Sequence, residues 1–195
     1  FALLAGLIVD LAGDDPNNII TTLTPLLYYA MTVIIGLTFM VFIFYPLIIY
    51  SYTGVPISKF LKAIFPAQML AFSTSSSAAT LPLTMKRVEK NLNVSDEVTS
   101  FVCPLGATIN MDGTSIHQAI SAVFIAQAFG QDLTLVDQVA IVLTATLSSI
   151  GAAAVPGAGL IMLVIVLGAI GIDPQGLALI IAIDRPLDML RTVVN

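Results

Sequence analysis

The chain has 195 residues, of which 57% are hydrophobic and 10% are charged, and its formal net charge is −5. An average soluble domain has about 25% charged residues, so this composition excludes an ordinary soluble domain and indicates a membrane protein. The sequence pI of about 4.4, without a basic patch interleaved with aromatic residues, argues against a nucleic-acid partner, and a single cysteine excludes a disulfide framework.

Two apolar stretches open the chain. Residues 1–12 stop at a polar turn, which predicts the end of one helix. Residues 19–52 are interrupted only by threonines and Pro46, and they exceed the roughly 20 residues that a spanning helix needs. Because the chain starts inside a hydrophobic segment and Asn195 lies in a helical pattern, we expect a part of a longer protein.

Residues 57–91 consist of two short halves around a polar interruption at residues 73–80. Each half is too short to cross a bilayer comfortably, which predicts a re-entrant hairpin with the serines at its tip. Most of the 7 lysine and arginine residues flank this segment: Lys59, Lys62, Lys86, Arg87 and Lys90. The positive-inside rule therefore places the open end of the hairpin in the cytoplasm.

Residues 95–130 form a long apolar run with Asn110-Met111-Asp112-Gly113-Thr114 at its centre. Ser95 and the acidic residues after it predict a capping box at its start. A carboxylate at mid-membrane depth is costly unless it is paired, hydrated or bound to an ion. Glycine lets the helix unwind, and freed carbonyls persist in a membrane only where they face a cavity or a cation. The motif therefore predicts a broken helix that holds a charged ligand; a polar contact between helices is the alternative.

Residues 133–171 repeat the hairpin pattern, with a tip of small residues and one proline at 148–159. Since one full helix separates the two hairpins, the second should enter the membrane from the opposite face. Two short interrupted segments in corresponding places are typical of an inverted-repeat transporter, whose site lies where they meet.

Residues 174–195 form the last segment, in which Asp184, Asp188, Arg191 and Asn195 fall within about half of a helical wheel. An internal ion pair, Asp188 with Arg191 or Asp184 with Arg185, would explain some of these groups. They exceed what one structural pair needs, so we favour a substrate site.

Motifs at residues 75–82, 110–114, 149–159 and 188–192 stand in this order: SSSAATLP, NMDGT, SIGAAAVPGAG and DMLRT. Together they resemble the dicarboxylate/amino acid:cation symporter family of archaeal aspartate, bacterial glutamate and vertebrate excitatory amino acid transporters. The resemblance covers nearly the whole chain. It implies an all-α membrane protein with the glutamate-transporter fold: two re-entrant hairpins, broken helices and an inverted repeat.

The segments of this fold follow by resemblance. Residues 1–12 would end transmembrane helix 5, 13–52 would be helix 6, 57–91 hairpin 1, 95–130 helix 7, 133–171 hairpin 2, and 174–195 the first part of helix 8. Residues 19–195 would form a mobile transport domain. The implied protein is not an enzyme but a sodium-coupled symporter of L-aspartate or L-glutamate, a homotrimer in the plasma or inner cell membrane that works by alternating access.

The resemblance also implies the substrate site. Arg191 would bind the side-chain carboxylate, which suits a planar guanidinium, and Asp188 would accept the substrate ammonium. Neutral hydrogen bonds would come from Thr114, Thr192 and Asn195. The hairpin tips would close over the substrate with Ser76, Ser77, Val155 and Gly159, while Asp184 and Arg185 would support the site.

Sodium sites are implied in the same way, with the oxygen ligands that a hard cation prefers. One site would use carbonyls of Gly106, Asn110 and Asn195. A second would use Thr108 with carbonyls of Ser149, Ile150 and Ala152. A third would use Asp112 and the Asn110 side chain, and Met111 belongs to the same break.

Two other functions stay open. A C4-dicarboxylate symporter of the same family would lack an aspartate at the position of Asp188. An intramembrane aspartyl protease would pair Asp112 with Asp188 or Asp184, but no Gly-x-Gly-Asp segment is present. Arg191 would also disturb a shared-proton pair, because it favours ionised carboxylates.

Overall fold

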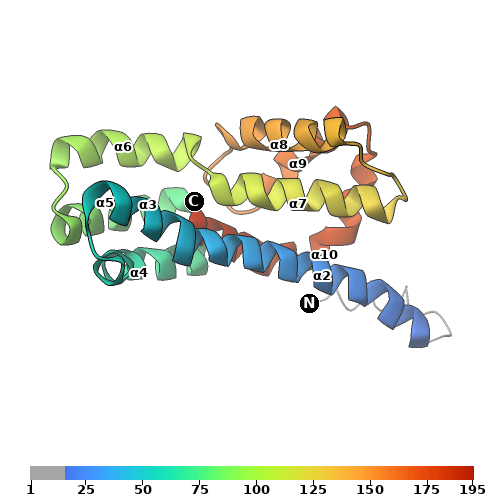
Figure 1. Ribbon diagram of the computed structural model, residues 1–195, viewed down its shortest axis with the longest axis horizontal. Coiled ribbons are helices and arrows are strands. Elements are labelled where there is room, and N and C mark those ends of the chain that lie inside the picture. Colours follow the sequence, from blue (N-terminus) through green and yellow to red (C-terminus); the bar gives the residue numbers. More distant parts are fainter. Residues whose placement is uncertain (1–15) are drawn as a thin grey trace.

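The computed structural model describes residues 16–195, and every regular element within them is a helix, in agreement with the predicted all-α class (Figure 1). The predicted segment 1–12 lies outside the described residues. Helix α2 (Pro16–Phe39), the π-helix η1 (Met40–Phe44) and α3 (Tyr45–Thr53) run on as one continuous rod. Within the described residues, the stretch Leu23–Thr53 of this rod is the one helix that is long and apolar enough to cross a bilayer.

The π turn η1 ends two residues before Pro46. Pro46 has no backbone N–H, and its ring would clash with the carbonyl four residues earlier in a regular α-helix. The helix widens instead, and the Tyr45 N–H donates to the carbonyl of Met40, five residues back. The rod therefore stays continuous, but the residues that follow are rotated relative to those before.

Helices α4 (Ile57–Thr74) and α5 (Ser77–Leu92) form the first hairpin, which is packed tightly along its length. Its tip is the pair Ser75 and Ser76. Ser75 ends α4 in the left-handed region with φ +52°, which is uncommon outside glycine. The Ser76 Oγ begins α5 by accepting a hydrogen bond from the Ala79 N–H at 3.2 Å, so the serine run serves as a helix cap as well as a tip.

The next long segment is interrupted at the NMDGT motif. Helix α6 (Asp96–Ile109) ends and α7 (Asp112–Ala128) begins on either side of Asn110 and Met111. The predicted capping box at Ser95 is wrong, because the Ser95 side chain makes no cap hydrogen bond. Three residues later the chain has Val98, whose side chain cannot return a hydrogen bond.

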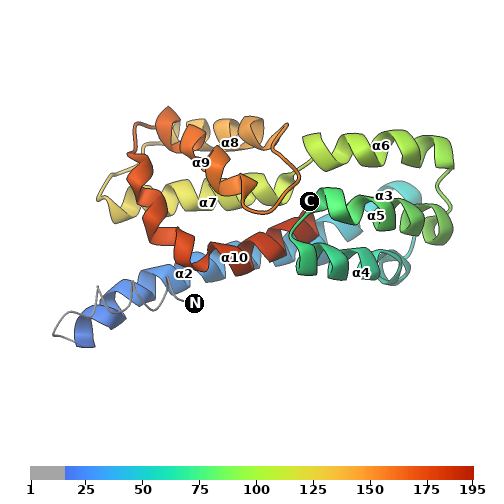
Figure 2. The ribbon, with the colours of Figure 1, turned by 180° about the vertical axis from the view of Figure 1, so that it is seen from behind.

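Helices α8 (Leu135–Ser149) and α9 (Ala158–Ala169) form the second hairpin, with a non-helical tip at residues 150–157. A capping box does occur here, where Thr134 and Asp137 bond reciprocally at the start of α8. The short 3-10 helix η2 (Pro174–Gly176) leads into α10 (Leu177–Val194), which returns along α2 towards the middle of the molecule (Figure 2).

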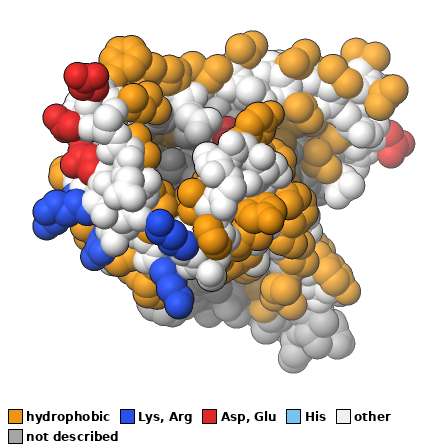
Figure 3. Space-filling model, turned by 60° about the vertical axis from the view of Figure 1, so that its left-hand side comes forward, with side chains coloured by type: hydrophobic (Ala, Val, Ile, Leu, Met, Phe, Trp, Pro, Cys, Tyr) orange, Lys and Arg blue, Asp and Glu red, His pale blue; other side chains and the backbone are white. Residues whose placement is uncertain are grey.

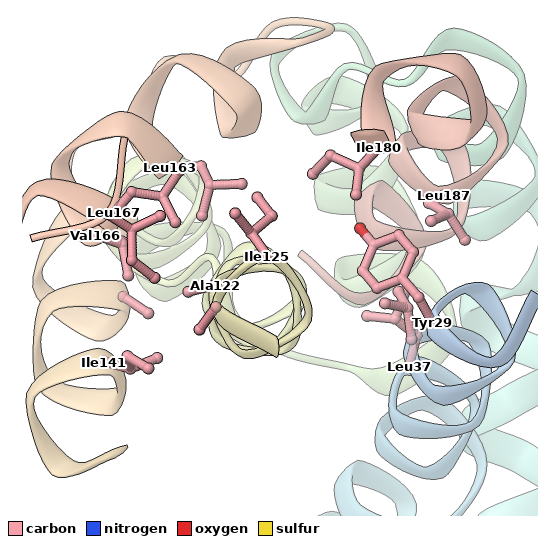
Figure 4. Close-up of a cluster of buried hydrophobic side chains, with 14 of the residues drawn as sticks. Tyr29, Leu37, Ala122, Ile125, Ile141, Leu163, Val166, Leu167, Ile180 and Leu187 are labelled. Atoms are coloured by element: carbon pink, nitrogen blue, oxygen red, sulfur yellow. The ribbon is translucent and has the colours of Figure 1, made fainter. Parts of the chain in front are cut away.

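The hydrophobic core joins α2, α7, α8, α9 and α10. Figure 4 shows Ala122 and Ile125 of α7 between Leu163 of α9 on one side and Ile180 of α10 and Tyr29 of α2 on the other. Ile125, Leu163 and Ile180 are fully buried. This core holds α7 and α10 side by side, which positions the ends of both helices for the site described below.

The surface is apolar over most of the described helices. Large side chains such as Leu27, Ile35, Phe42 and Ile161 are more than half exposed, as expected where lipid covers them. Lysine and arginine side chains and several acidic ones gather instead at one end of the face in Figure 3, and another acidic side chain lies at its opposite side. This distribution is the one expected if the open end of the first hairpin lies outside the hydrocarbon.

Candidate functional site

The end of α10 lies between the tips of both hairpins and the break between α6 and α7 (Figures 1 and 2). The two tips touch: the Ser76 hydroxyl donates to the Ala154 carbonyl at 2.9 Å, and the Ala78 N–H reaches the same oxygen at 3.3 Å. The second tip also touches the end of α6, where the Gly151 N–H donates to the Thr108 carbonyl at 2.8 Å. Segments far apart in the sequence thus converge on one point.

Helix α7 meets α10 at Gly113. A Cβ there would lie 2.5 Å from the Arg191 carbonyl oxygen and 2.9 Å from the Asn195 Oδ1, so no larger residue fits without a shift. The close approach lets the Thr114 N–H donate to Asn195 Oδ1 at 3.2 Å, and Asn195 Nδ2 donate to Thr114 Oγ1 at 3.0 Å. Gly113 belongs to the first turn of α7 rather than to the break between α6 and α7. The need for a glycine at this position is therefore better explained by close packing against α10 than by unwinding of the helix.

Arg191 and Asp188 form a buried ion pair, with side chains 4% and 1% exposed. The second carboxylate oxygen of Asp188 accepts a hydrogen bond from the Gly157 N–H at 3.0 Å and lies 3.5 Å from Arg185 Nη1. Asp188 therefore ties the tip of the second hairpin to α10. The ion pair between Asp188 and Arg191, which was the structural alternative to a substrate site, is therefore present. It lies where the two hairpin tips, the helix break and the end of α10 meet.

Several buried donors at this point have no partner among the described residues: Arg191 Nε, Arg191 Nη1 and the Ser75 hydroxyl. A buried donor left without an acceptor costs about 1–3 kcal/mol, so such a group calls for an explanation. Gly159 lies directly against the guanidinium, where any side chain would overlap Nη1. An anionic ligand would supply the missing acceptors.

A cavity of about 10 Å³ lies between these groups, about enough room for one water molecule. Its walls come from both tips, the helix break, α9 and α10: Ser75, Ser77, Met111, Thr114, Ala152, Ala153, Ala154, Val155, Ala158, Gly159, Arg191, Thr192 and Asn195. An amino acid can enter only if a hairpin tip or the Arg191 side chain moves.

Most residues expected to bind substrate lie at this cavity. Its walls include Ser77, Thr114, Val155, Gly159, Arg191, Thr192 and Asn195. Ser76 and Asp188 lie immediately behind the walls, bonded to Ala154 and Arg191. The supporting residues differ, because Arg185 is 58% exposed whereas Asp184 is buried and lies 3.4 Å from His117 Nε2.

The residues expected to bind sodium are more scattered. Met111, Ala152 and Asn195 line the cavity. The others lie outside it: Gly106, Thr108, Asn110, Asp112, Ser149 and Ile150. The Gly106 carbonyl accepts the Asn110 N–H at 2.9 Å, and the Ser149 hydroxyl accepts a hydrogen bond from Ser115 at 2.7 Å.

Backbone oxygens at the break and the second tip fit a hard cation. No donor from the described residues reaches the carbonyls of Asn110, Ile150 or Ala152. Within residues 16–195 there is also no cluster of three or more His, Cys, Asp or Glu side chains that would suit a transition metal. Free carbonyls with an occasional carboxylate are the ligands that an alkali or alkaline-earth ion prefers.

Sequence reasoning missed some contacts. Gln118 is fully buried and joins both arms of the second hairpin, since its Nε2 donates to the Gly159 carbonyl at 3.2 Å and its Oε1 accepts from Ser148 at 2.6 Å. Gln118 follows Thr114 by one helical turn, a spacing that could have indicated the shared face. Tyr45, which donates to Asp112 Oδ2, has no such local signal.

Two helical hairpins that meet at a broken helix, beside a buried pair of opposite charges, are the arrangement typical of secondary transporters of the membrane. The chain belongs to the sodium:dicarboxylate symporter family, whose family model matches residues 1–195. Membership in this transporter family implies a membrane location.

Curated relatives agree with this assignment. The chain is 43% identical over 195 residues to an excitatory amino acid transporter of Caenorhabditis elegans, covering 100% of this chain and 38% of the relative. Over 167 residues, or 86% of this chain, it is 46% identical to excitatory amino acid transporter 2 of Homo sapiens and 47% identical to excitatory amino acid transporter 1 of Ambystoma tigrinum. These matches cover 29% and 31% of those relatives, so the chain spans about a third of their length.

Proposed function

We propose that the protein is a sodium-coupled symporter of acidic amino acids, L-aspartate or L-glutamate. The observation that carries this proposal is the buried Arg191, whose Nη2 pairs with Asp188 while Nε and Nη1 have no partner among the described residues. An acidic amino acid offers a carboxylate to Arg191 and an ammonium to Asp188, so each buried charge gains its own partner. A C4-dicarboxylate has no cation to offer Asp188, which makes it the weaker substrate.

Substrate binding and movement of the second hairpin are linked through Asp188. The Gly157 N–H and the substrate ammonium compete for the same carboxylate, so binding changes how the tip is held. Gly151 and Gly157, with φ of +82° and +78°, flank the tip and provide the backbone freedom for this motion. Thr114, Thr192, Asn195, Ser76 and Ser77 would donate or accept neutral hydrogen bonds around the bound molecule.

Sodium binding would favour closure of the same hairpin. The free carbonyls of Ile150 and Ala152 belong to its tip, whereas that of Asn110 belongs to the helix break. A cation held between the tip carbonyls and Thr108 would join the second hairpin to the end of α6. Other oxygens proposed for sodium come from Gly106, Thr108, Ser149 and Asn195, and from Asp112 beside Met111. With ions and substrate bound, residues 19–195 would move as a transport domain, in a homotrimer of the plasma or inner cell membrane.

The protease alternative loses support from the contacts of its two proposed catalytic carboxylates. Asp112 accepts a hydrogen bond from Tyr45, whereas Asp188 pairs with Arg191 and accepts from Gly157. Asp184 lies beside His117 instead. Carboxylates with separate partners do not share a proton, which an aspartyl protease requires.

Uptake into proteoliposomes by the full-length protein tests the proposal. Labelled aspartate and glutamate should accumulate only with an inward sodium gradient, and succinate should compete poorly. Arg191→Cys should lose aspartate uptake and prefer neutral amino acids, because the cation for the side-chain carboxylate is gone. Sodium-independent uptake, strong competition by succinate, or unchanged aspartate uptake by Arg191→Cys would each contradict the assignment.

A further inference from the structure

Tyr45 connects the long rod to the broken helix. It is the first residue of α3, and its hydroxyl donates to Oδ2 of Asp112, the first residue of α7, 67 positions further along the chain. The Tyr45 side chain is partly buried, and its ring lies edge-on to that of Phe44 with centroids 5.7 Å apart. This contact reaches a carboxylate that the substrate cavity does not include.

The π turn determines where Tyr45 points. Buried residues follow one another along the rod at steps of three or four and then at a step of five: Leu26, Tyr29, Val33, Leu37, Val41 and Pro46. In an uninterrupted α-helix, Tyr45 would continue this stripe four residues after Val41. The extra residue of the π turn rotates the rod by about 100°, so Pro46 takes that place and Tyr45 lies beside the stripe, where its hydroxyl reaches Asp112.

We propose that Tyr45 is a positioning residue for sodium binding at Asp112, an inference that rests on the proposed function. The phenol occupies Oδ2, and no donor from the described residues reaches Oδ1, which is left for the cation. When a fixed donor holds one oxygen of a carboxylate, the second oxygen points in a constant direction. The side chain then loses little conformational entropy when the ion binds to that second oxygen. The π turn that precedes Tyr45 sets the direction of the phenol.

Tyr45→Phe tests this role, because it removes only the hydroxyl and keeps the ring. In proteoliposomes with the full-length protein, the sodium concentration for half-maximal aspartate uptake should rise about 10–100-fold, as for other groups that orient a metal ligand. The KM for aspartate at saturating sodium should stay unchanged. Tyr50→Phe is the matched control: Tyr50 lies in the same helix, is 52% exposed and should change neither quantity.

A second measurement does not depend on transport. Sodium alone should raise the melting temperature of the purified wild-type protein in detergent, and Tyr45→Phe should need higher sodium for the same rise. In an Asp112→Asn background, Tyr45→Phe should add nothing further to the sodium response.

The outcomes are distinct. Wild-type sodium dependence in Tyr45→Phe overturns the positioning role, and so does an additive effect in Asp112→Asn. Equal losses of apparent affinity for sodium and aspartate indicate general structural damage and also overturn it. A wild-type protein that takes up aspartate without sodium contradicts the proposed function instead.

Discussion

Gly159→Ala is expected to weaken substrate binding through Arg191. Gly159 is the second residue of α9, and a Cβ there would overlap guanidinium Nη1 and lie 3.1 Å from Nη2. The guanidinium must move away from α9, although Arg191 is only 4% exposed and paired with Asp188. Misplacing one hydrogen bond to a charged group removes about 1.5–3 kcal/mol. At 1.4 kcal/mol per factor of ten, the Kd for aspartate should rise about 10–150-fold.

Equilibrium binding of labelled aspartate to the purified full-length protein at saturating sodium measures this effect. Gly168→Ala is the control, since Gly168 lies in the same helix and its Cβ would meet nothing within 4 Å. That variant should bind like the wild type and gain a little stability, because alanine favours a helix over glycine by about 1 kcal/mol. A wild-type Kd for Gly159→Ala, or an equal loss in Gly168→Ala, would refute the reasoning.

Two other substitutions follow from the same geometry. Asp188→Asn should abolish sodium-driven aspartate uptake, because a neutral amide neither pairs with the substrate ammonium nor balances the charge of Arg191. Robust aspartate uptake by correctly inserted Asp188→Asn protein would count against a role of Asp188 in binding the ammonium. Gly113→Ala should destabilise the protein by about 1–3 kcal/mol, since its Cβ would lie 2.5 Å from a backbone oxygen of α10 that cannot rotate away. Thermal melting in detergent checks this, with Gly168→Ala as control, and an unchanged melting temperature would disprove the close approach.

Composition and local pattern were enough to predict a membrane protein with hydrophobic helices, whereas the all-α transporter fold was implied by the family resemblance. Hydrophobic runs and the polar or glycine-rich tips that interrupt them are local properties, so they can be read along the chain. The NMDGT motif was singled out in this way, and α6 and α7 separate within it. The charges of α10 also stood out, because buried charge is rare in an apolar chain.

Helix capping shows a limit of prediction from local sequence. Ser95 satisfies the pattern of a capping residue but makes no side-chain cap, whereas Thr134 makes one with Asp137. The residue three positions later is an apolar valine after Ser95 and a carboxylate after Thr134, which decides only the reciprocal half of the box. Ser76 caps α5 although Ala79 stands at that place, so this residue does not decide whether the first side chain caps the helix. A sequence pattern that asks only for a serine or threonine followed by acidic residues does not distinguish Ser95 from Thr134.

By itself, the sequence determined that the protein is helical, that it belongs in a membrane, and that interrupted segments carry its polar residues. Only the tertiary structure decided that Tyr45 reaches Asp112, that Gly113 admits α10, and that Gly157 bonds to Asp188. Such contacts depend on how far each helix is rotated and shifted against its neighbour. One extra residue in a π turn changes that rotation by about 100°, while the hydrophobic pattern that identifies the helix remains almost the same.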